Sequence, residues 1–262
     1  MQSVSVNSIL SDFLDHLGAA PVSVLMLDYD GTLAPFQVDR DHAYPYPEVV
    51  PVLERIVQGG KTRIIVITGR PVGEIKTLLR PLDKLEVWGS HGMERLLPNR
   101  TFRQMEIDNE TMAVLSRAEE WVIAAGLRSR AEIKPGGIAI HWRGLPDDEV
   151  ADIKDRVRQG WSAFAERPGL KLLKFEAGLE LRVAHPDKGD AVAAILADAE
   201  PGAEIAYLGD DLTDEDAFRA LRGRGLPILV RAEYRETSAE AWLKPPNELV
   251  GFLNQWLNRT QE

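Results

Sequence analysis

Short hydrophobic runs alternate with helix-like patterns at both ends of the chain. Strand-like runs are expected at 22–28, 63–67, 85–88, 203–208 and 226–230. Helices are expected at 47–59, 72–80, 188–198 and 214–222, and the chain closes with the helical pattern "ELVGFLNQWL". Nearly continuous apolar strands separated by helices are typical of a parallel sheet that is covered on both faces. We therefore predict an α/β core with a Rossmann-like parallel sheet, built from residues 1–106 and 184–262.

The middle of the chain follows a different pattern. A predicted helix at 110–126 precedes two strands around the Gly-Gly turn of "RAEIKPGGIAIHWRG". A second helix at 147–165 precedes two strands around Ala177–Gly178 in "LKLLKFEAGLELRV". Hairpins of this kind pair antiparallel. We predict an inserted αββαββ (α+β) domain over residues 107–183, which divides the core into its two segments.

The composition is that of an ordinary globular protein, with 44% hydrophobic and 27% charged residues among 262. The net charge of -10 repels polyanions, so we expect neither nucleic acid nor membrane as a partner. The absence of cysteine excludes disulfides and thiolate chemistry. No apolar run is long enough to span a membrane, and the amino terminus lacks a signal-peptide pattern. We therefore expect a cytoplasmic protein and, by default, a monomer.

Two acidic pairs directly follow predicted strands. Asp28 and Asp30 lie in "LDYDGT", and Asp210 and Asp211 lie in "YLGDDL". In open α/β sheets, ligands bind beyond the carboxyl ends of the strands, and Mg2+ takes carboxylate oxygens as ligands. A lone aspartate in a loop is more often a turn or helix-cap residue. An acidic first helical turn also explains Asp214 without any function, but it does not explain Asp210 and Asp211.

Two further positions at strand ends and helix starts favour a bound phosphate. "VITGR" places Thr68 and Gly69 before a helix that opens at Pro71, and the N–H groups at such a start bind anions. A helix cap and a turn would explain the same two residues equally well. Lys188 in "HPDKGDAV" stands at a helix start, where the helix dipole disfavours a cation unless an anion is bound nearby. A solvated lysine is the alternative.

These pieces occur in the order of the motifs of a known superfamily. The DxD pair, the threonine, the lysine and the DD pair together resemble the haloacid dehalogenase (HAD) superfamily of phosphatases. Six segments narrow the resemblance to trehalose-6-phosphate phosphatases: "LDYDGTLAPF", "VITGR", "GSHGMER", "AEIKPGGIAIHWR", "ELRVAHPDKGDAV" and "GDDLTDEDAF". The resemblance runs from residue 22 to residue 218 and implies a HAD core with a type IIB-like cap as its inserted domain.

The resemblance also implies an activity, a Mg2+-dependent hydrolysis of trehalose 6-phosphate to trehalose and phosphate. Asp28 would attack the phosphorus and form an aspartyl-phosphate. Asp30 would protonate the departing sugar oxygen and later deprotonate the attacking water. Thr68 and Lys188 would hold the phosphoryl oxygens. By the same resemblance, Mg2+ is held by Asp28, the backbone carbonyl of Asp30 and Asp210, while Asp211 and Asp214 order its waters or the lysine.

Polar residues alternate along the predicted strands of the inserted domain. Glu132 and Lys134 share one face of a strand, His141 and Arg143 repeat this on its hairpin partner, and the spacing recurs in "LELRV". A solvated sheet face would show the same alternation, and a lone histidine such as His91 is usually structural. The resemblance assigns these positions to the sugar phosphate. The predicted substrate-binding residues are Gly69, Arg70, His91, Gly92, Glu94, Glu132, Lys134, His141, Arg143, Glu180 and Arg182.

Two other functions are compatible with the sequence. A related phosphatase would act on another sugar phosphate, such as sucrose phosphate or a glycosyl-phosphoglycerate. A catalytically silent domain would bind a sugar phosphate for regulation. The intact set of Asp28, Asp30, Thr68, Lys188 and Asp210 favours an enzyme, because a silent domain has no need of all five.

Overall fold

The fold is that of a computed structural model, which describes residues 2–37, 40–80, 82, 84–175 and 177–261. The chain forms two compact units, a core unit of Met1–Arg103 with Lys188–Glu262 and a middle unit of Gln104–Asp187. The middle unit extends beyond the predicted 107–183 at both ends. Residues of the middle unit bind its carboxyl-terminal extension. Arg182 donates to the carbonyl oxygen of Pro186, and Lys171 pairs with Asp187 at 3.2 Å.

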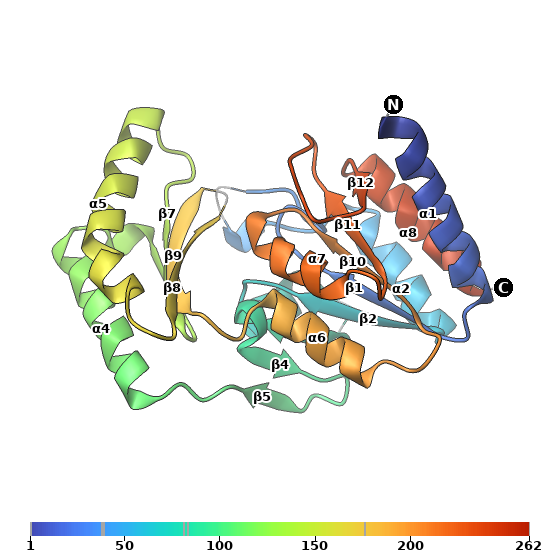
Figure 1. Ribbon diagram of the computed structural model, residues 1–262, viewed down its shortest axis with the longest axis horizontal. Helices are drawn as coiled ribbons and strands as arrows, with labels where there is room; N and C mark the ends of the chain where they lie inside the picture. The colour runs from blue at the N-terminus through green and yellow to red at the C-terminus, as the bar shows by residue number, and fades with distance from the viewer. Residues whose placement is uncertain (1, 38–39, 81, 83, 176, 262) are drawn as a thin grey trace. The chain divides into compact units, whose positions relative to one another are not determined.

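The core unit is built on a mixed eight-stranded sheet (Figure 1). Its strands are Ser23–Leu27 (β1), Thr62–Ile67 (β2), Glu86–Gly89 (β3), Glu94–Leu96 (β4), Phe102–Gln104 (β5), Glu204–Gly209 (β10), Leu226–Val230 (β11) and Ala241–Leu243 (β12). Their order is β12-β11-β10-β1-β2-β3-β4-β5, with parallel pairing from β12 to β3. β4 runs antiparallel to β3, so the sheet is parallel in most of its width but not throughout.

Helices cover both faces of the core sheet (Figure 1). They span Gln2–Ala19 (α1), Val49–Gly59 (α2), Val72–Leu78 (α3), Lys188–Asp198 (α6), Glu215–Leu221 (α7) and Asn247–Gln261 (α8). Successive residues of β1 point to opposite faces. Leu25 and Leu27 pack in one cluster with α1, α2, α3 and α8, whereas Val24 and Met26 pack in another with α6 and α7. Burial on both faces explains why the strands read as continuous hydrophobic runs.

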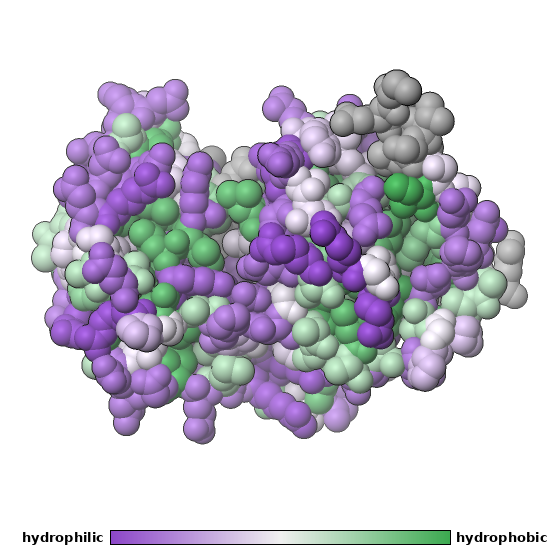
Figure 2. Space-filling model, viewed as in Figure 1, coloured by the Kyte–Doolittle hydropathy of each residue, from purple (hydrophilic) through white to green (hydrophobic). Residues whose placement is uncertain are grey.

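The middle unit consists of two helices and a four-stranded sheet in the order αββαββ. Its elements are α4 (Asn109–Ala124), β6 (Ala131–Lys134), β7 (Gly137–His141), α5 (Asp147–Ala165), β8 (Leu170–Phe175) and β9 (Gly178–Val183). Neighbouring strands in the order β6-β7-β9-β8 pair antiparallel, as the hairpin pattern predicts. Ile138, Ile140 and Leu181 are buried, and α4 contacts β7 while α5 contacts β9. Hydrophilic side chains cover the first turn of α5, at the upper left of Figure 2.

Most predicted elements agree with the structure. The helices expected at 147–165 and 188–198 have those bounds, and most other expected ends lie within two residues of the observed ones. Such offsets arise because helix caps and strand ends carry little apolar periodicity. Helix α1 and the short strands β4, β5 and β12 were not predicted. None of the described helices combines the length and the hydrophobicity that crossing a membrane requires.

Candidate active site

The carboxyl ends of three neighbouring strands bring the predicted core residues together. β1 lies between β10 and β2 and pairs with both in parallel register up to its last residue. Asp28 follows β1, Thr68 follows β2 and Asp210 follows β10, so the three side chains emerge at one edge of the sheet. All three are buried. Ligands of open α/β sheets bind at this edge, where neighbouring strand connections separate.

Lys188 joins this group from the first position of α6. Its Nζ lies 2.7 Å from Oδ1 of Asp28 and 2.7 Å from Oδ1 of Asp214. Burial alone would lower the pKa of Lys188, but Asp214 and Asp28 raise it above its ordinary value, so the ammonium stays charged. The two carboxylates also offset the unfavourable position of a cation at a helix start. Two protein anions therefore hold the predicted phosphate-binding lysine in place.

Asp214 uses both of its oxygens to hold neighbouring groups. Its Oδ1 accepts hydrogen bonds from Lys188 and, at 2.5 Å, from the hydroxyl of Tyr207. Its Oδ2 accepts from the backbone N–H groups of Asp210 and Asp211 at 3.0 and 2.9 Å. Burial raises the pKa of Tyr207 well above its ordinary value, which keeps the hydroxyl protonated. Asp214 is thus better suited to positioning the lysine and the 210–211 loop than to binding a metal directly.

Asp210 has the opposite environment. Neither oxygen of its buried carboxylate has a hydrogen-bond partner among the described residues. Burial raises the pKa of Asp210 well above its ordinary value, and the charges of Asp28 and Asp214 raise it further. Gly31, with φ 81°, leaves the space beside it, because a Cβ there would lie 2.1 Å from Oδ2 of Asp210. Carboxylate oxygens of Asp28, Asp210 and Asp214 lie within 4.8 Å of one another, so the group fits a divalent cation.

A divalent cation at this group would change the charge of Asp28. Burial raises the pKa of Asp28 to about 7, although Lys188 opposes the shift. A nearby cation favours the ionised form of a carboxylate. The backbone N–H of Asp28 donates to the carbonyl oxygen of Leu208 at 2.8 Å, which ties its position to β10. Near neutral pH, the charge state of Asp28 therefore depends on whether a cation is bound.

Asp30 is held by Arg70. Nε and Nη2 of Arg70 lie 2.6 and 2.7 Å from the two carboxylate oxygens of Asp30, and Nη1 lies 3.1 Å from Glu74. The guanidinium carbon lies 5.5 Å from the centre of the Tyr29 ring. A bidentate pair of this kind fixes the orientation of the carboxylate. Arg70 is only 1% exposed. The contacts of Arg70 therefore favour a role in positioning Asp30 over the predicted contact of Arg70 with substrate.

Thr68, Gly69 and His91 pack together beyond the ends of β2 and β3. The hydroxyl of Thr68 accepts from the N–H of Arg70 at 3.2 Å, and the N–H of His91 donates to the carbonyl of Thr68 at 2.9 Å. Gly69 allows this approach, because a Cβ there would lie 2.7 Å from Nε2 of His91. The predicted phosphate-binding hydroxyl and the predicted substrate-binding histidine therefore belong to one local structure of the core unit.

Glu94 stabilises the turn that carries His91 and Gly92. Its Oε2 accepts hydrogen bonds from the N–H of Val72 and from the hydroxyl of Ser90, both at 3.0 Å. Val72 begins α3, so Glu94 satisfies one of the N–H groups that a helix start leaves unpaired. Ser90, His91 and Gly92 have φ values of 49°, 58° and 104°, a left-handed stretch that needs such support. The predicted contact of Glu94 with substrate stays a proposal beside this structural role.

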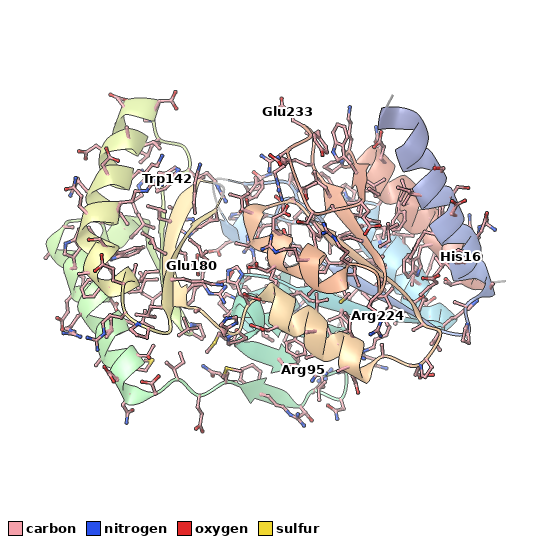
Figure 3. The ribbon with its side chains drawn as sticks, viewed as in Figure 1. His16, Arg95, Trp142, Glu180, Arg224 and Glu233 are labelled. Carbon is pink, nitrogen blue, oxygen red and sulfur yellow. The ribbon has the colours of Figure 1, made fainter. Side chains whose placement is uncertain are left out.

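In the middle unit, the predicted sugar-binding residues form rows across the sheet. Glu132 and Glu180 flank Ala139 in one row, and Lys134 and Arg182 flank a glycine in the next. Figure 3 shows Glu180 on β9. Because the residues of the central strand are small, the longer charged side chains on either side of it have space to extend across the row. The predicted alternation thus places these four charged residues on one face of the sheet.

The charged rows are connected by ion pairs. Nε2 of His141 lies 2.8 Å from Oε2 of Glu132, and Nζ of Lys134 lies 3.6 Å from the same oxygen. Lys134 also lies 3.2 Å from Oε1 of Glu180. The resulting chain of alternating donors and acceptors differs from a set of independently solvated side chains. It offers both kinds of group that sugar hydroxyls need.

Arg143 does not continue this pattern. β7 ends at His141, and Arg143 lies in the turn that follows, so the prediction that both alternate on one strand is wrong. Gly144, with φ 77°, and Pro146 turn the chain toward α5. The carbonyl of Arg143 accepts from Arg130 at 3.3 Å. The hydrophobic and polar alternation of "IAIHWR" continues past the strand end and does not mark it.

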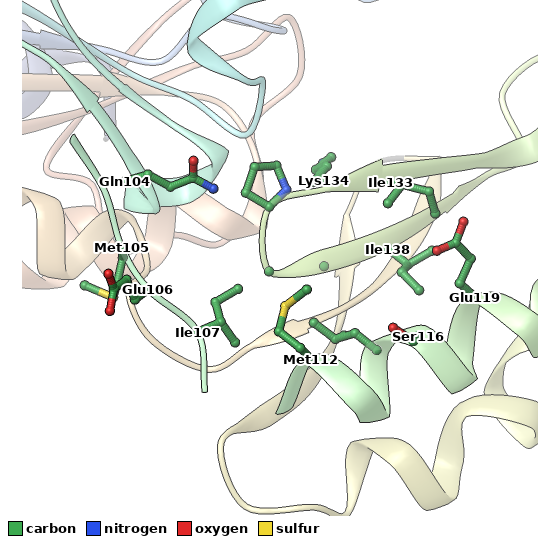
Figure 4. Close-up of a pocket in the computed structure, with 14 residues that line it drawn as sticks. Gln104, Met105, Glu106, Ile107, Met112, Ser116, Glu119, Ile133, Lys134 and Ile138 are labelled. Carbon is green, nitrogen blue, oxygen red and sulfur yellow. The ribbon is translucent and has the colours of Figure 1, made fainter. Parts of the chain in front are cut away.

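A pocket of about 600 Å3 opens between α4, the β6–β7 hairpin and residues 104–107 (Figure 4). Its apolar lining comprises Met105, Ile107, Met112, Leu115, Ile133 and Ile138. Ile133 alternates with Glu132 and Lys134 along β6, so its side chain lies on the opposite face of the sheet from the charged rows. Lys134 borders the pocket, but its ion pairs belong to the rows. The pocket is therefore not the predicted sugar site.

Residues 26–245 of the chain match a family model described as trehalose-phosphatase. The matched range contains both acidic pairs, Thr68, Lys188 and the whole middle unit. The chain belongs to the trehalose-phosphatase family. The resemblance inferred from the six motifs is confirmed by this match.

Relatives within and beyond the trehalose-phosphatase family agree with the match. A trehalose-phosphate phosphatase of Mycobacterium marinum is 32% identical over 93% of this chain and 65% of that protein. The chain spans 65% to 78% of the lengths of the curated relatives that it matches first. The C-terminal domain of a C. albicans trehalose-6-phosphate phosphatase has a TM-score of 0.83 at 18% identity, covering 95% of this chain and 96% of that chain. A haloacid dehalogenase-like hydrolase from B. subtilis has a TM-score of 0.61 at 16% identity, covering 89% and 99%. These structures confirm the predicted fold class.

Two residues that support the candidate site are not predicted by the sequence. Tyr207 lies inside the hydrophobic run of β10, where its hydroxyl is no signal of a role, and only folding places it against Asp214. Gly31 reads as an ordinary turn residue, but its missing side chain leaves room for the carboxylate of Asp210. A glycine directly after an acidic pair at a strand end is the signal that could have identified it.

Proposed function

We propose that the protein hydrolyses trehalose 6-phosphate to trehalose and phosphate through an aspartyl-phosphate on Asp28. The observation that supports this best is the cluster of Asp28, Asp210 and Asp214, in which Asp28 and Asp214 pair with Lys188 and the carboxylate of Asp210 lacks a partner among the described residues. A buried carboxylate without a partner is costly unless a cation binds it. Membership of the trehalose-phosphatase family and the similarity to a trehalose-phosphate phosphatase of Mycobacterium marinum support the choice of sugar.

Asp28 is the nucleophile, and Asp30 is the acid of the first half-reaction and the base of the second. Oδ1 of Asp28 pairs with Lys188, so Oδ2 is the oxygen that attacks phosphorus. The new bond from Asp28 to phosphorus forms as the bond from phosphorus to the sugar oxygen breaks, and Asp30, protonated and released from Arg70, gives that oxygen its proton. Water then attacks the aspartyl-phosphate, Asp30 takes a proton from the water, and phosphate leaves with the Asp28 carboxylate restored.

Lys188 and Thr68 bind the phosphoryl oxygens in this proposal. An ammonium group has three N–H donors, and Asp28 and Asp214 use two of those on Lys188. The third is directed to a phosphoryl oxygen, and the hydroxyl of Thr68 and the N–H of Gly69 supply further donors. Because Lys188 contacts both the attacking carboxylate and the phosphoryl group, it reduces the repulsion between two anions.

The carboxyl edge of the core sheet fits Mg2+. When bound, the cation would neutralise negative charge between the Asp28 carboxylate and the phosphoryl group. The side chain of Asp214 accepts hydrogen bonds from the backbone N–H groups of Asp210 and Asp211. The side chain of Asp211 caps the turn that follows. The residues that would hold the cation are Asp28, the backbone carbonyl of Asp30 and Asp210.

The charged rows of the middle unit bind the sugar in this proposal. Glu132, Lys134, His141 and Glu180 form a connected set of donors and acceptors, and the hydroxyl groups of a disaccharide need both. The set is ordered before substrate binds, which lowers the entropy cost of recognition. The remaining proposed contacts are Gly69, His91, Gly92, Glu94, Arg143 and Arg182, while Arg70 positions Asp30.

A panel of sugar phosphates tests the whole proposal. Phosphate release would be measured with Mg2+ or with EDTA for the wild type, for Asp28→Asn and for the control Asp198→Asn. Asp198 is a suitable control because it is an exposed aspartate that pairs with Arg63 at 3.2 Å. We expect trehalose 6-phosphate to be the best substrate, and we expect EDTA and Asp28→Asn each to abolish release. The Asp198→Asn control should keep the wild-type rate.

The other outcomes separate the alternatives. Faster release from sucrose phosphate or a glycosyl-phosphoglycerate would keep the core chemistry and reject the proposed sugar. Release that survives Asp28→Asn would reject the aspartyl-phosphate. No release from any ester, together with tight binding of trehalose 6-phosphate, would favour a regulatory binding domain.

A further inference from the structure

The loop that carries Asp210 and Asp211 is held from two sides. On one side, its N–H groups donate to Oδ2 of Asp214 at 3.0 and 2.9 Å. On the other side, its carbonyl oxygens accept from Arg235. Nε of Arg235 lies 3.2 Å from the carbonyl oxygen of Asp210, and Nη2 lies 2.7 Å from that of Asp211. Two side chains from different parts of the chain therefore fix the backbone of this loop.

Arg235 is itself anchored. Its Nη1 pairs with Oε1 of Glu215 and donates to the carbonyl oxygen of Glu236 at 3.0 Å. Glu215 also accepts from the hydroxyl of Thr237 and the N–H of Ser238, each at 2.7 Å. Burial alone would raise the pKa of Glu215, but these donors and Arg235 lower it below its ordinary value, so the carboxylate stays ionised. The side chains of Arg235 and Glu215 are only 18% and 13% exposed, which limits the screening of this pair by water.

We propose that Arg235 is a positioning residue for the divalent cation, because it holds the backbone of Asp210 and Asp211 so that the Asp210 carboxylate faces the cation. That the reaction needs this cation rests on the proposed function. The contacts of Arg235 with the two carbonyl groups do not depend on that function. Arg235 lies 25 and 24 residues beyond the two aspartates, in the connection between β11 and β12. No motif marks it. Its guanidinium reaches two neighbouring carbonyl groups at once, which the single nitrogen of a lysine cannot reproduce.

The orientation of this backbone matters because no hydrogen bond from the described residues fixes the Asp210 carboxylate itself. Neither of its oxygens meets a hydrogen-bond donor within the described part of the chain. Its direction is therefore set by the backbone and by packing. Mg2+ demands nearly octahedral geometry with ligands at about 2.0–2.1 Å, so a small rotation of the peptide groups would displace a ligand. Residues that orient metal ligands typically change metal affinity by about 10–100-fold when they are replaced.

The test compares Arg235→Met and Arg235→Lys with a matched control, Arg63→Met. Arg63 is a partly buried arginine that pairs with Glu86 at 2.7 Å from β2. It stands near the amino end of that strand, whereas the cation site lies at the carboxyl end. Mg2+ binding to the metal-free proteins would be measured by isothermal titration calorimetry without substrate. Melting temperatures would be recorded for the same samples.

We expect Arg235→Met to weaken Mg2+ binding by about tenfold or more, and Arg235→Lys to weaken it less. Arg63→Met should lower the melting temperature and leave the Mg2+ affinity unchanged. In phosphate-release assays, Arg235→Met should raise the Mg2+ concentration for half-maximal rate, and saturating Mg2+ should restore most of kcat. A structural residue alone would change stability without this dependence on Mg2+.

Wild-type Mg2+ affinity in Arg235→Met would overturn the inference. If that variant does not fold, Arg235→Lys decides the question, because unchanged affinity in it would overturn the inference equally. The calorimetry does not depend on turnover. Weakened Mg2+ binding in a protein that hydrolyses no ester would uphold the role of Arg235 and reject the proposed function. Normal hydrolysis with unchanged Mg2+ binding in the variants would reject the role of Arg235 and leave the proposed function standing.

Discussion

The carboxyl edge of the core sheet and the charged rows of the middle unit use similar side chains in different ways. At the core edge, Lys188 comes from a helix start and meets carboxylates that follow two different strands. In the middle unit, His141, Glu132 and Lys134 lie on adjacent strands and pair along one face. The core groups are enclosed, whereas those of the rows are neighbours on a single sheet. Position in the core depends on distant chain segments, and position in the rows depends on strand register.

This difference predicts how a substitution in each region affects stability and activity. Removing one charge at the core edge leaves another buried without its counter-charge, which is costly for stability and for every substrate. In the rows, Glu132 pairs with both Lys134 and His141, so it keeps one partner after a single loss. We therefore expect changes in the rows to affect the choice of substrate more than the stability of the protein.

The largest effect is expected for Lys188→Met. It leaves Asp28 and Asp214 buried without their shared cation, so the free energy of unfolding in EDTA should fall by about 3–5 kcal/mol. Phosphate release should fall by about 1,000-fold or more for all esters, because the lysine contacts the reacting groups. Urea unfolding and initial rates measure the two effects. The control Arg156→Met, which breaks the exposed pair with Asp152 in the middle unit, should change stability by less than about 1 kcal/mol. Equal losses in the two variants would remove the contrast between the regions.

The next effect is a pH dependence at the core edge. The pKa of Asp28 rises from 3.8 to about 7 on folding, so the folded protein binds more protons than the unfolded chain in this range. In EDTA, this contribution to stability is present at low pH and is lost as pH rises through about 7. Asp28→Asn cannot ionise, so its stability relative to the wild type should increase from pH 4 to pH 8. Mg2+ should abolish this trend by stabilising the ionised wild type.

Urea unfolding at a series of pH values measures this trend. Asp198→Asn serves as the control, since Asp198 is an exposed aspartate that pairs with Arg63. A constant difference between wild type and Asp28→Asn across the range would show that Asp28 ionises normally in the folded protein. In that case its burial would not control its charge.

A smaller and more selective effect is expected for Lys134→Met in the rows. The substitution removes the cation shared by Glu132 and Glu180, so KM for trehalose 6-phosphate should rise about 10–100-fold. Turnover of p-nitrophenyl phosphate, which has no sugar, should stay at the wild-type value. Lys174→Met is the matched control, because Lys174 alternates to the other face of the same sheet. A parallel loss on both substrates would place Lys134 in the chemistry and contradict the division of roles.

The smallest effect is expected for Asp108→Ala at the start of α4. Asp108 accepts hydrogen bonds from the N–H and the hydroxyl of Thr111 at 2.9 and 2.7 Å. Loss of this helix cap should lower the melting temperature by about 2–4 °C. KM and kcat should not change, because the charged rows do not include this helix end. Differential scanning calorimetry measures the shift, and a change in KM would show that α4 influences the rows.

The two regions also differ in how far the sequence predicts them. Asp28, Thr68 and Asp210 lie together, as their positions directly after hydrophobic runs indicate, because parallel strands end at one edge. The alternation of Glu132 and Lys134 likewise identifies a strand face. It continues past the real strand end, so Arg143 was placed wrongly. The pairing of Arg70 with Asp30 was not foreseen either, because it joins residues 40 positions apart.

The sequence alone determines the order and type of most elements and the location of the acidic pairs. It does so because hydrophobic periodicity records which side of each element is buried. Only the tertiary structure decides which carboxylate oxygens accept hydrogen bonds. Asp210 and Asp214 are both aspartates beside the same strand end, yet Asp214 accepts hydrogen bonds from Tyr207, Lys188 and the loop, while the carboxylate oxygens of Asp210 have no hydrogen-bond partner among the described residues. Hydrogen-bond partners come from segments far apart in the chain, and only their packing brings each donor to one oxygen rather than another.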